Sequence, residues 1–390
     1  MNGSLIPLSL YIHVPWCVRK CPYCDFNSHQ RPASLPEAAY VDALLADLLM
    51  EVPLALGRPV QSIFFGGGTP SLFSGAAIAR ILDGVRAQLT LVENCEITLE
   101  TNPGTAEFDR FEAYLVAGVN RISLGVQSFD DDKLRRLGRI HGGAQARTAY
   151  QMARAAGVAN INLDLMFGLP NQSLQDAIAD LQAALELAPE HVSHYQLTLE
   201  PQTAFARTPP ANLPDEDALV DMLDACQALL STAGYTQYEV SAYAQPAMRS
   251  RHNLNYWLYG DYLAIGAGAH NKCTADGRVR RRVRQRNPSG FLKLAGSPNV
   301  LSEDRQIESA ELPFEFMLNA LRLREGFAAP LFGERTGLAL DQQPGFQQGL
   351  RRGLLVAQGE QIRATELGYR FLNDTVALFL PQGLANAASN

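Results

Sequence analysis

The chain has 390 residues, of which 47% are hydrophobic and 19% charged, a balance that excludes a disordered protein. The 40 acidic and 33 basic residues give a net charge of −7, which argues against a nucleic-acid-binding role for the whole molecule. No stretch reaches the roughly 18 uninterrupted apolar residues of a membrane span, and residues 1–7 do not have the pattern of a secretory signal, so we expect a cytoplasmic protein.

Six β-rich segments alternate with helical patterns as far as about residue 201. They cover residues 8–14, 62–65, 96–100, 121–127, 160–166 and 191–199. A repeated strand–helix–strand order predicts right-handed crossovers and a parallel sheet. Because a closed barrel of this kind needs eight units, the pattern predicts an α/β fold with an open, partial (β/α)6 barrel, in a domain that covers residues 1–235.

Several helix ends in this domain carry clear signals. Thr105 can cap the N-terminus of a helix that ends at Gly118, and Pro36 suits the first turn of another helix. Asp215 opens an amphipathic helix that ends at Gly234. These boundaries predict the helical layer that a buried parallel sheet requires.

Beyond the barrel the pattern changes twice. Residues 236–298 are irregular and aromatic, end in an arginine-dense stretch, and are interpreted as a connecting region. Residues 299–390 predict a smaller, mostly α-helical and winged-helix-like domain. It contains a helix over 313–323, two short strands around Gly359 and a last helix over 368–380.

Three cysteines follow the first predicted strand directly. Cys17, Cys21 and Cys24 have the spacing C-x3-C-x2-C, and a loop of this length can point three thiolates at one centre. Soft thiolates select an iron–sulfur cluster or zinc, and His29 is a candidate fourth ligand for a closed zinc site. The remaining cysteines, at 95, 226 and 273, are scattered and are expected to be buried, unreactive thiols.

Small or polar residues close the following strands. A glycine run at 66–68 precedes Thr69, Glu100 and Gln127 end the next two strands, and Asp164 lies late in the fifth. Each residue alone could serve a turn or a helix cap. Because the carboxyl ends of barrel strands meet at one mouth, their recurrence predicts a ligand pocket beside the cysteine loop.

The cysteine loop resembles the signature of the radical S-adenosylmethionine family, C-x3-C-x-Φ-C with an aromatic Φ, through Cys17, Cys21, Tyr23 and Cys24. The resemblance implies that the three thiolates hold a [4Fe-4S] cluster whose free iron binds S-adenosylmethionine. A three-ligand motif suits such a cluster better than it suits zinc.

The resemblance also implies which residues hold the cofactor: Tyr11, Tyr23, Gly67, Gly68, Thr69, Glu100, Gln127, Arg139 and Asp164. By the same resemblance, the glycine motif contacts the methionine amino group and Arg139 its carboxylate. Gln127 and Asp164 then lie near the ribose, Glu100 lies near the methionine end, and the two tyrosines flank the cluster and the cofactor.

Over nearly its whole length the chain resembles the oxygen-independent coproporphyrinogen III oxidase group, including residues 11–15, 125–129 and 164–170. The decarboxylating enzymes of that group carry a further cysteine two residues after the third, where this chain has Phe26. The chain is more similar to their sister branch, the HemW haem chaperones, which share the phenylalanine and a His-Asn-x-x-Tyr-Trp motif, here residues 252–257. This resemblance implies that the protein binds haem and delivers it to haem proteins, such as respiratory cytochromes at the membrane.

In this interpretation the cluster and S-adenosylmethionine gate haem transfer or oligomerisation, without classical enzymatic turnover. The enzyme alternative is an oxidase that oxidatively decarboxylates the propionates of coproporphyrinogen III, and the third alternative is a zinc-stabilised binding protein. The expected partners are haem, apo-haem proteins at the membrane, the membrane surface and a second copy of the chain. No nucleic-acid partner is expected.

His252 is the predicted haem ligand, because an imidazole can ligate haem iron while Tyr256 and Trp257 stack on the macrocycle. The alternatives are a packing role for His252 and axial ligation by His270. Six arginines at 278, 280, 281, 282, 284 and 286 can form the charged edge of a solvated hairpin. Otherwise they can bind, in order of preference, anionic lipid, haem propionates or nucleic acid.

Overall fold

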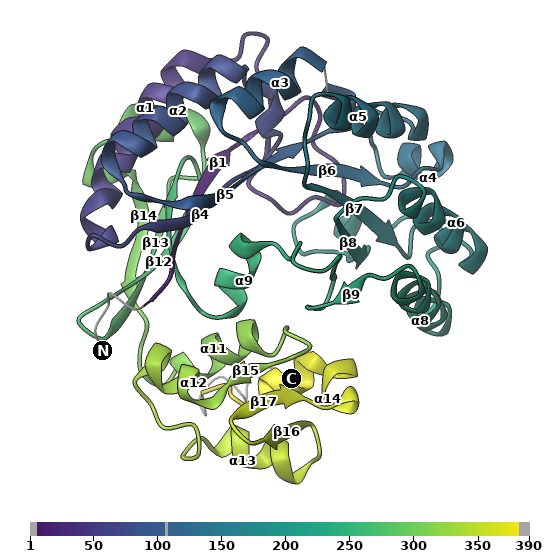
Figure 1. Ribbon diagram of the computed structural model, residues 1–390, viewed down its shortest axis with the longest axis vertical. Coiled ribbons are helices and arrows are strands. Elements are labelled where there is room, and N and C mark those ends of the chain that lie inside the picture. The colour runs from purple at the N-terminus through teal and green to yellow at the C-terminus, as the bar shows by residue number, and fades with distance from the viewer. Residues whose placement is uncertain (1–5, 106–107, 382–390) are drawn as a thin grey trace.

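The parallel core of the protein consists of six strands, each next to its predecessor in the chain. In the computed structural model, which describes residues 6–105 and 108–381, these strands form the middle of a twelve-stranded sheet that does not close (Figure 1). They are β1 (Leu8–Val14), β4 (Val60–Gly67), β5 (Leu91–Thr101), β6 (Arg121–Gln127), β7 (Ile161–Phe167) and β8 (His191–Gln196). The open, partial (β/α)6 barrel is confirmed.

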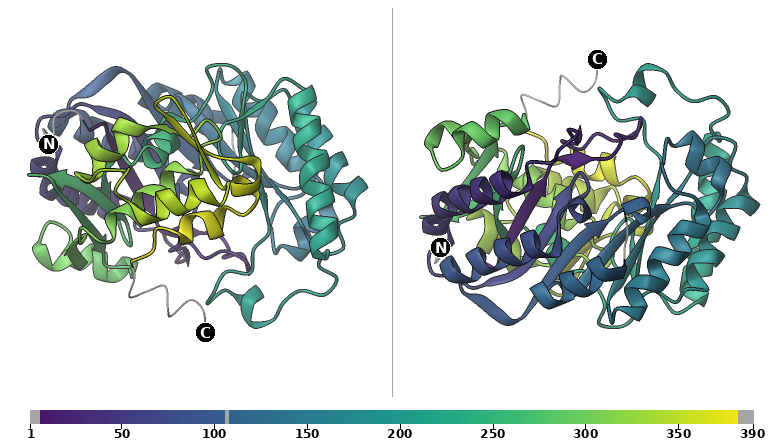
Figure 2. Two further views of the ribbon diagram at one scale, coloured as in Figure 1. Left: turned by 90° about the horizontal axis from the view of Figure 1, so that it is seen from below. Right: turned by 90° about the horizontal axis from the view of Figure 1, so that it is seen from above.

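Helices cover the outer, convex face of this sheet (Figures 1 and 2). They are α1 (Glu37–Glu51), α2 (Gly75–Gln88), α3 (Phe108–Ala117), α5 (Gly143–Ala155), α6 (Leu174–Leu185) and α8 (Glu216–Thr232), with the short α4 (Asp131–Arg136) and α7 (Ala204–Arg207) between them. Ser74, Ser173 and Asp215 cap their helices through side-chain oxygens that accept a backbone N–H. With helices on one face, strands such as β1 are buried almost throughout.

The predicted helix ends are largely confirmed. Asp215 caps α8, and Gly118 and Gly234 adopt positive φ angles of 108° and 86° after their helices. Pro36 is the N-cap of α1, one residue before its first turn. The predicted cap at Thr105 depends on side chains that lie outside the described part of the chain.

The segment that the sequence pattern left irregular is largely β-structure. Beyond β1 the sheet continues through β11 (Asp261–Ile265), β12 (His270–Ala275), β13 (Arg278–Arg284) and β14 (Leu301–Gln306). Beyond β8 it continues through β10 (Ala242–Ala244) and β9 (Thr236–Gln237), while β2 (Trp16–Cys17) and β3 (His29–Gln30) pair separately. The apolar pattern is broken because buried charges, such as those of Asp261 and Lys272, lie within these strands.

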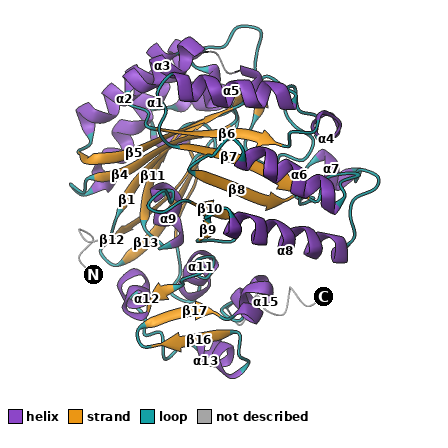
Figure 3. Ribbon diagram, turned by 45° about the vertical axis from the view of Figure 1, so that its right-hand side comes forward, coloured by secondary structure: helices purple, strands orange, loops and turns teal. Residues whose placement is uncertain are grey.

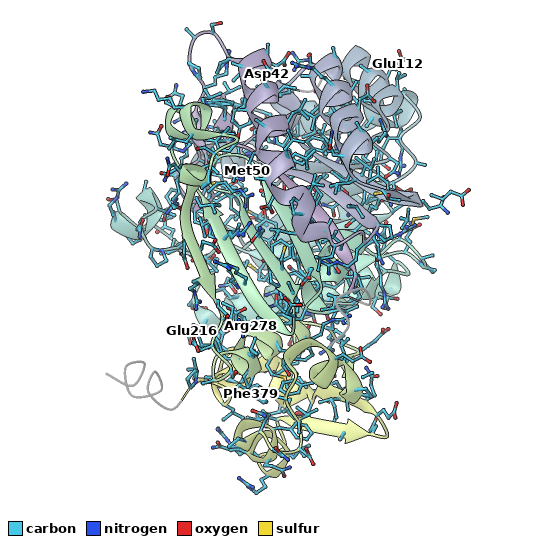
Figure 4. All side chains as sticks on the ribbon, turned by 90° about the vertical axis from the view of Figure 1, so that its left-hand side faces the viewer. Asp42, Met50, Glu112, Glu216, Arg278 and Phe379 are labelled. Carbon is cyan, nitrogen blue, oxygen red and sulfur yellow. The ribbon has the colours of Figure 1, made fainter. Side chains whose placement is uncertain are left out.

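The arginine-dense strand β13 lies inside the sheet, between β12 and β14. The guanidinium of Arg284 is buried and pairs with Asp47 at 3.3 Å and with Glu51 at 2.6 Å, both on α1. The outer end of the hairpin, at Arg278, lies beside the C-terminal domain (Figure 4). The interpretation as a solvated, charged edge is therefore wrong for Arg284, because acids from a distant helix bury and neutralise it.

The concave side of the sheet carries α9 (Arg251–Trp257), and a small domain lies across the open side of the barrel (Figure 3). This domain contains α11 (Leu312–Ala320), α12 (Ala329–Thr336), α13 (Pro344–Arg351), α14 (Glu366–Arg370), α15 (Leu372–Ala377) and a sheet of β15 (Phe327–Ala328), β17 (Gln361–Ala364) and β16 (Leu355–Gln358). Its separate core is built around Phe316, which packs edge-on against Phe327 and Phe332. A further helix, α10 (Pro288–Leu294), packs on α1.

Two predictions for this domain have different outcomes. The two short strands around Gly359 are confirmed as β16 and β17. The single last helix over 368–380 is wrong, because the backbone of Phe371 (φ −109°, ψ 51°) leaves the helical region and divides the segment into α14 and α15. Within the described residues, none of the helices is both long and apolar enough to cross a membrane.

Candidate functional site

A cavity of about 430 Å³ opens where the parallel strands end. We call it the first cavity. It is lined by all three clustered cysteines and by eight of the residues expected to hold the cofactor: Tyr23, Gly67, Gly68, Thr69, Glu100, Gln127, Arg139 and Asp164. Most of these residues come from the cysteine loop and from β4, β5, β6 and β7 or the positions just after them, while Arg139 comes from the loop after α4. The barrel topology thus brings together positions that are far apart in the sequence.

The cysteine loop presents three free, partly exposed thiols to this cavity. Cys17 ends β2, whose pairing with β3 fixes the start of the loop, and the backbone N–H of Cys24 donates to the carbonyl of Cys21 at 3.2 Å. Burial raises the pKa of Cys17 and of Cys24, while hydrogen bonds, from Thr69 to Cys17 and from Ser28 to both, act in the opposite direction. A bound metal centre would supply the positive charge that favours the thiolate forms.

The other cysteines behave as expected. Cys95, Cys226 and Cys273 are buried away from the cavity. Burial raises the pKa of Cys95 to about 11 and that of Cys226 to about 12, so their thiols stay protonated and unreactive near neutral pH.

The candidate fourth ligand of a zinc site is not with the thiols. Nε2 of His29 lies 3.3 Å from Oδ1 of Asn27 and 3.2 Å from the carbonyl oxygen of Arg286, and His29 does not line the first cavity. Across residues 6–105 and 108–381, no three His, Cys, Asp or Glu side chains are arranged around a single-ion site. The structure thus does not form the closed zinc set that the sequence allowed.

Two carboxyl groups lie on the wall of the cavity. Glu100 accepts a hydrogen bond from the backbone N–H of Gly67 at 3.2 Å, and Asp164 accepts from Ser123 at 3.2 Å and from Asn162 at 2.8 Å. Burial, and then the charge of Asp164, raises the pKa of Glu100 to about 8. Burial also raises the pKa of Asp164. Acids held in this way are suited to ammonium or hydroxyl groups of a ligand.

Arg139 and Gln127 form the polar end of the cavity. Arg139 donates to the carbonyl of Gly125 at 2.6 Å and approaches the sulfur of Cys21 at 3.8 Å, and its Nε has no partner within the described residues. Gln127 has a φ of +71°, rare for a residue with a side chain, and its Oε1 accepts from the hydroxyl of Tyr195 at 2.7 Å. Backbone strain of this kind concentrates at functional sites.

The glycine motif is needed for close backbone approach. Gly67 has a φ of +109°, and a Cβ at this position would overlap the ring of His13. A Cβ at Gly68 would come within 2.5 Å of the carbonyl oxygen of Trp16. Only glycine lets the end of β4 approach β2, which places Thr69 beside Cys17.

The donor set fits the cluster and its cofactor. Three thiols without a fourth protein ligand leave one iron of a [4Fe-4S] cluster free. The unpartnered Nε of Arg139 can donate to the carboxylate of an amino acid, and the half-buried carboxyl groups of Glu100 and Asp164 can accept hydrogen bonds from its ammonium group and from ribose hydroxyls. The polar atoms of the cavity therefore match a small zwitterionic ligand beside the thiols.

Two of the expected site residues lie outside the first cavity. Tyr11 lines a neighbouring cavity, where its hydroxyl lies 3.0 Å from Nδ1 of His13. His252 lines neither cavity: it is 1% exposed, its Nδ1 lies 3.0 Å from Oγ of Ser62, and its Nε2 lies 2.9 Å from the hydroxyl of Tyr256. Burial lowers the pKa of His252 to about 3. Haem ligation by this ring would require at least one of its two hydrogen bonds to break.

Sequence reasoning missed several lining residues. Ser123 on β6, Met166 on β7 and Tyr195 on β8 also face the cavity, and Asn102 follows β5. The signal that could have identified Ser123 is a polar residue within an otherwise apolar strand, two positions before Gly125. Met166 and Tyr195 carry no such signal, because an apolar or aromatic residue near a strand end usually indicates packing.

Comparisons with known proteins agree with this geometry. Residues 11–184 match the radical SAM superfamily and residues 307–371 match the HemN C-terminal domain. The chain is 51% identical to the heme chaperone HemW of Escherichia coli, over 97% of this chain and 100% of that protein, and 48% identical to the HemW of Haemophilus influenzae, over 97% and 99%. It is 35% identical to the HemW of Mycobacterium tuberculosis, over 95% of this chain and 94% of that one.

A solved structure shares the whole architecture. The coproporphyrinogen III oxidase HemN of E. coli, a radical SAM enzyme, superposes with a TM-score of 0.82 over 97% of this chain and 91% of that one, at 23% identity. At this identity the match establishes the fold alone. Together with the end-to-end similarity to the chaperones, it shows that the chain belongs to the radical SAM superfamily and, within it, to the HemW family.

Proposed function

We propose that the protein is a haem chaperone that binds haem, a [4Fe-4S] cluster and S-adenosylmethionine, and passes haem to apo-haem proteins. The observation that carries this proposal is the 51% identity to a heme chaperone over 97% of the chain. The presence of Phe26 supports it, because the decarboxylating relatives have a further cysteine at that position. Residues 1–235 would hold the cluster and the cofactor, and residues 236–298 and 299–390 would serve haem handling.

The thiols and most of the expected cofactor residues of the first cavity have a proposed role. The thiolates of Cys17, Cys21 and Cys24 hold the cluster, and Arg139 orients the carboxylate of the cofactor, whose amino group meets the glycine motif. Glu100 accepts a hydrogen bond from ligand donors near the methionine end, and Gln127 and Asp164 accept hydrogen bonds from the ribose hydroxyl groups. When bound and reduced, the cluster supplies an electron that can cleave S-adenosylmethionine.

The cofactor site and haem handling are proposed to be coupled. In this view the cluster and S-adenosylmethionine gate haem release or self-association, while the protein works in the cytoplasm and meets acceptor proteins at the membrane surface. The gating role follows from an intact set of cofactor residues beside the changed position 26.

The test begins with anaerobic reconstitution. The wild-type protein should take up about four iron and four sulfide per chain, as one [4Fe-4S] cluster requires, whereas a Cys17→Ser/Cys21→Ser/Cys24→Ser variant should take up none. Cys226→Ser removes a buried thiol outside the cavity and is the matched control, with wild-type iron content expected.

The second step separates chaperone from oxidase. The reconstituted protein is incubated with haem and an apo-cytochrome, and separately, after reduction, with S-adenosylmethionine and coproporphyrinogen III. Stoichiometric haem uptake, transfer to the apo-cytochrome and no protoporphyrinogen support the proposal. Release of carbon dioxide with formation of protoporphyrinogen would establish the oxidase instead.

A further inference from the structure

A second cavity, of about 570 Å³, adjoins the first. Its wall is formed by β1, the cysteine loop, α9, β11, the start of β12 and α11, so it lies where the barrel, the added strands and the C-terminal domain meet. Its volume is within the range of about 300–1,000 Å³ that is usual for ligand pockets. Apart from Tyr11, Gly67 and Glu100, its lining residues have no assigned role in the cofactor functions described above.

The second cavity contains the one histidine of the chain that is exposed with a free ring. His270 opens β12, and within residues 6–105 and 108–381 neither of its ring nitrogens has a hydrogen-bond partner. The other six histidines are buried or half-buried. His13 also lines this cavity, but its nitrogens lie 3.0 Å from the hydroxyl of Tyr11 and 2.9 Å from the carbonyl oxygen of Asn27.

The surroundings of His270 favour an imidazole that can ligate iron. Only the neutral ring has a nitrogen lone pair for a metal. Partial desolvation in the cavity wall, and then the positive charge of Arg281, lowers the pKa of His270. The neutral form, which carries the lone pair, is therefore favoured over a wider pH range than in an isolated surface histidine.

Within the described residues, two arginines of the dense stretch, Arg278 and Arg286, have no ion pair, and of these only Arg286 lines the second cavity. Arg280, Arg281, Arg282 and Arg284 each pair with an acid of the protein. Arg286 is exposed, lines the second cavity, and has no ion pair within the described residues. A guanidinium in this position is suited to a ligand carboxylate.

The cavity also offers aromatic surfaces. Phe26 is 57% exposed on its rim, and Tyr256 and Tyr262 on its wall pack perpendicular to each other with centroids 4.5 Å apart. Trp257 lines the same wall, and its indole N–H has no partner within the described residues. Flat, apolar faces bounded by an imidazole and a guanidinium match a macrocycle with a metal centre and acidic side chains.

We propose that haem binds in the second cavity with His270 as its axial ligand, with Arg286 paired to a propionate and with Phe26 against the macrocycle. This inference rests on the proposed chaperone function and replaces His252 as the ligand. His252 then has a structural role, because its ring joins α9 to Ser62 on β4.

The test is a set of titrations of the anaerobically reconstituted protein, followed by the Soret band. His270→Ala should weaken ferric haem binding at least tenfold and shift the Soret band, while leaving the affinity for iron-free protoporphyrin IX unchanged. Added imidazole should restore the wild-type spectrum in His270→Gly. Lys293→Ala, at an exposed position of α10 outside both cavities, is the control and should bind haem as the wild type does.

The proposed pairing of Arg286 with a propionate is tested by comparing ligands with and without propionate charges. Arg286→Met should weaken binding of ferric haem severalfold, and should not change binding of its dimethyl ester, which lacks the propionate charges. Arg278→Met, at the other end of the hairpin (Figure 4), is the matched control with no change expected.

The outcomes distinguish this inference from the proposed function. If the wild type binds haem and His270→Ala keeps its spectrum and affinity, or if His252→Ala alone loses both with normal iron content, the second-cavity site is overturned and the chaperone function stands. If the wild type takes up no haem, the chaperone function fails and the haem site fails with it.

Discussion

Ionisable side chains are withdrawn from solvent in two regions of the molecule. In one region they form ion pairs with each other, and in the other they do not. Under the added strands, Arg284 lies between Asp47 and Glu51, and all three side chains are at most 1% exposed. In the first cavity, Glu100 and Asp164 are half-buried and have no ion pair within the described residues. A charge that the protein neutralises itself stabilises the fold, whereas an acid without a counter-charge is available to a ligand.

The largest effect is expected at Asp261, which neutralises two buried cations. Its carboxylate accepts from Arg58 at 2.7 Å and from Lys272 at 3.0 Å. Asp261→Asn should lower the free energy of unfolding in urea by about 5 kcal/mol, because the two cations stay buried without a counter-charge. Asp276→Asn, in the exposed turn of the same hairpin, should change it by less than about 0.5 kcal/mol.

The carboxylate of Asp261 also predicts how the free energy of unfolding depends on pH in acid. Burial disfavours the charged form of Asp261, but Lys272 and Arg58 together lower its pKa below the ordinary value of 3.8. Its contribution to stability is therefore present above that value and is lost as the pH falls through the lowered pKa. The Asp261→Asn variant should lack this acid-dependent loss. If the free energy of unfolding fell equally steeply with pH in wild type and variant, the lowered pKa would not belong to Asp261.

A smaller loss is expected at Arg284. Arg284→Met leaves Asp47 without a counter-charge and leaves Glu51 with only the more distant Arg282, at 3.7 Å. It should lower the free energy of unfolding by about 3 kcal/mol at neutral pH. The loss should shrink in acid, because burial already raises the pKa of Asp47 and its carboxyl can take up a proton. Arg280→Met removes an exposed guanidinium of the same strand, and should cost less than about 1 kcal/mol.

In protein without cluster or cofactor, Glu100 should give stability a pH dependence opposite to that given by Asp261. Its pKa of about 8 lies above the ordinary 4.5, so the folded state binds its proton more tightly than the unfolded state and stability falls as the pH rises between these values. Glu100→Gln should therefore raise the free energy of unfolding by about 2 kcal/mol at about pH 9, and have little effect near pH 4.5. Glu112→Gln, exposed on α3 (Figure 4), is the control with no change expected.

The smallest change in the free energy of unfolding is expected for an ion pair that is exposed to solvent. The side chains of Arg80 and Asp42 are 52% and 61% exposed. Asp42→Asn should lower the free energy of unfolding by less than about 1 kcal/mol, and the difference should vanish at about 1 M salt. A loss as large as that of Arg284→Met would show that pairing alone, without burial, decides these energies.

The barrel could be predicted from sequence because its strands carry local signals. The bounds of β1 and β6 agree with the predicted segments to the residue, since residues that disfavour strands flank them: Pro7 and Pro15 around β1, and Asn120 and Ser128 around β6. The first cavity could also be predicted, because residues at the carboxyl ends of parallel strands meet at one mouth of the barrel.

The added strands could not be predicted in this way. β11 pairs with β1, whose residues lie about 250 positions earlier, and the partner of Arg284 is Asp47, 237 positions away. A local pattern therefore shows a dense positive charge without the acids that neutralise it. The role of His252 could not be predicted for the same reason. Its motif is visible in the sequence, but the hydrogen bond between its ring and Ser62 forms only in the tertiary fold.

The two cavities share one wall, formed by Asp25, Phe26, Gly67 and Glu100. A ligand that moves this wall from one side changes the binding free energy on the other side, and thermodynamic linkage makes that change equal in both directions. With both proposed ligands bound, occupancy by the sulfonium metabolite would change the affinity for the tetrapyrrole, and the tetrapyrrole would change retention of the metabolite by the same factor. Phe26, which lines both cavities, would then be one of the residues that couple the two sites.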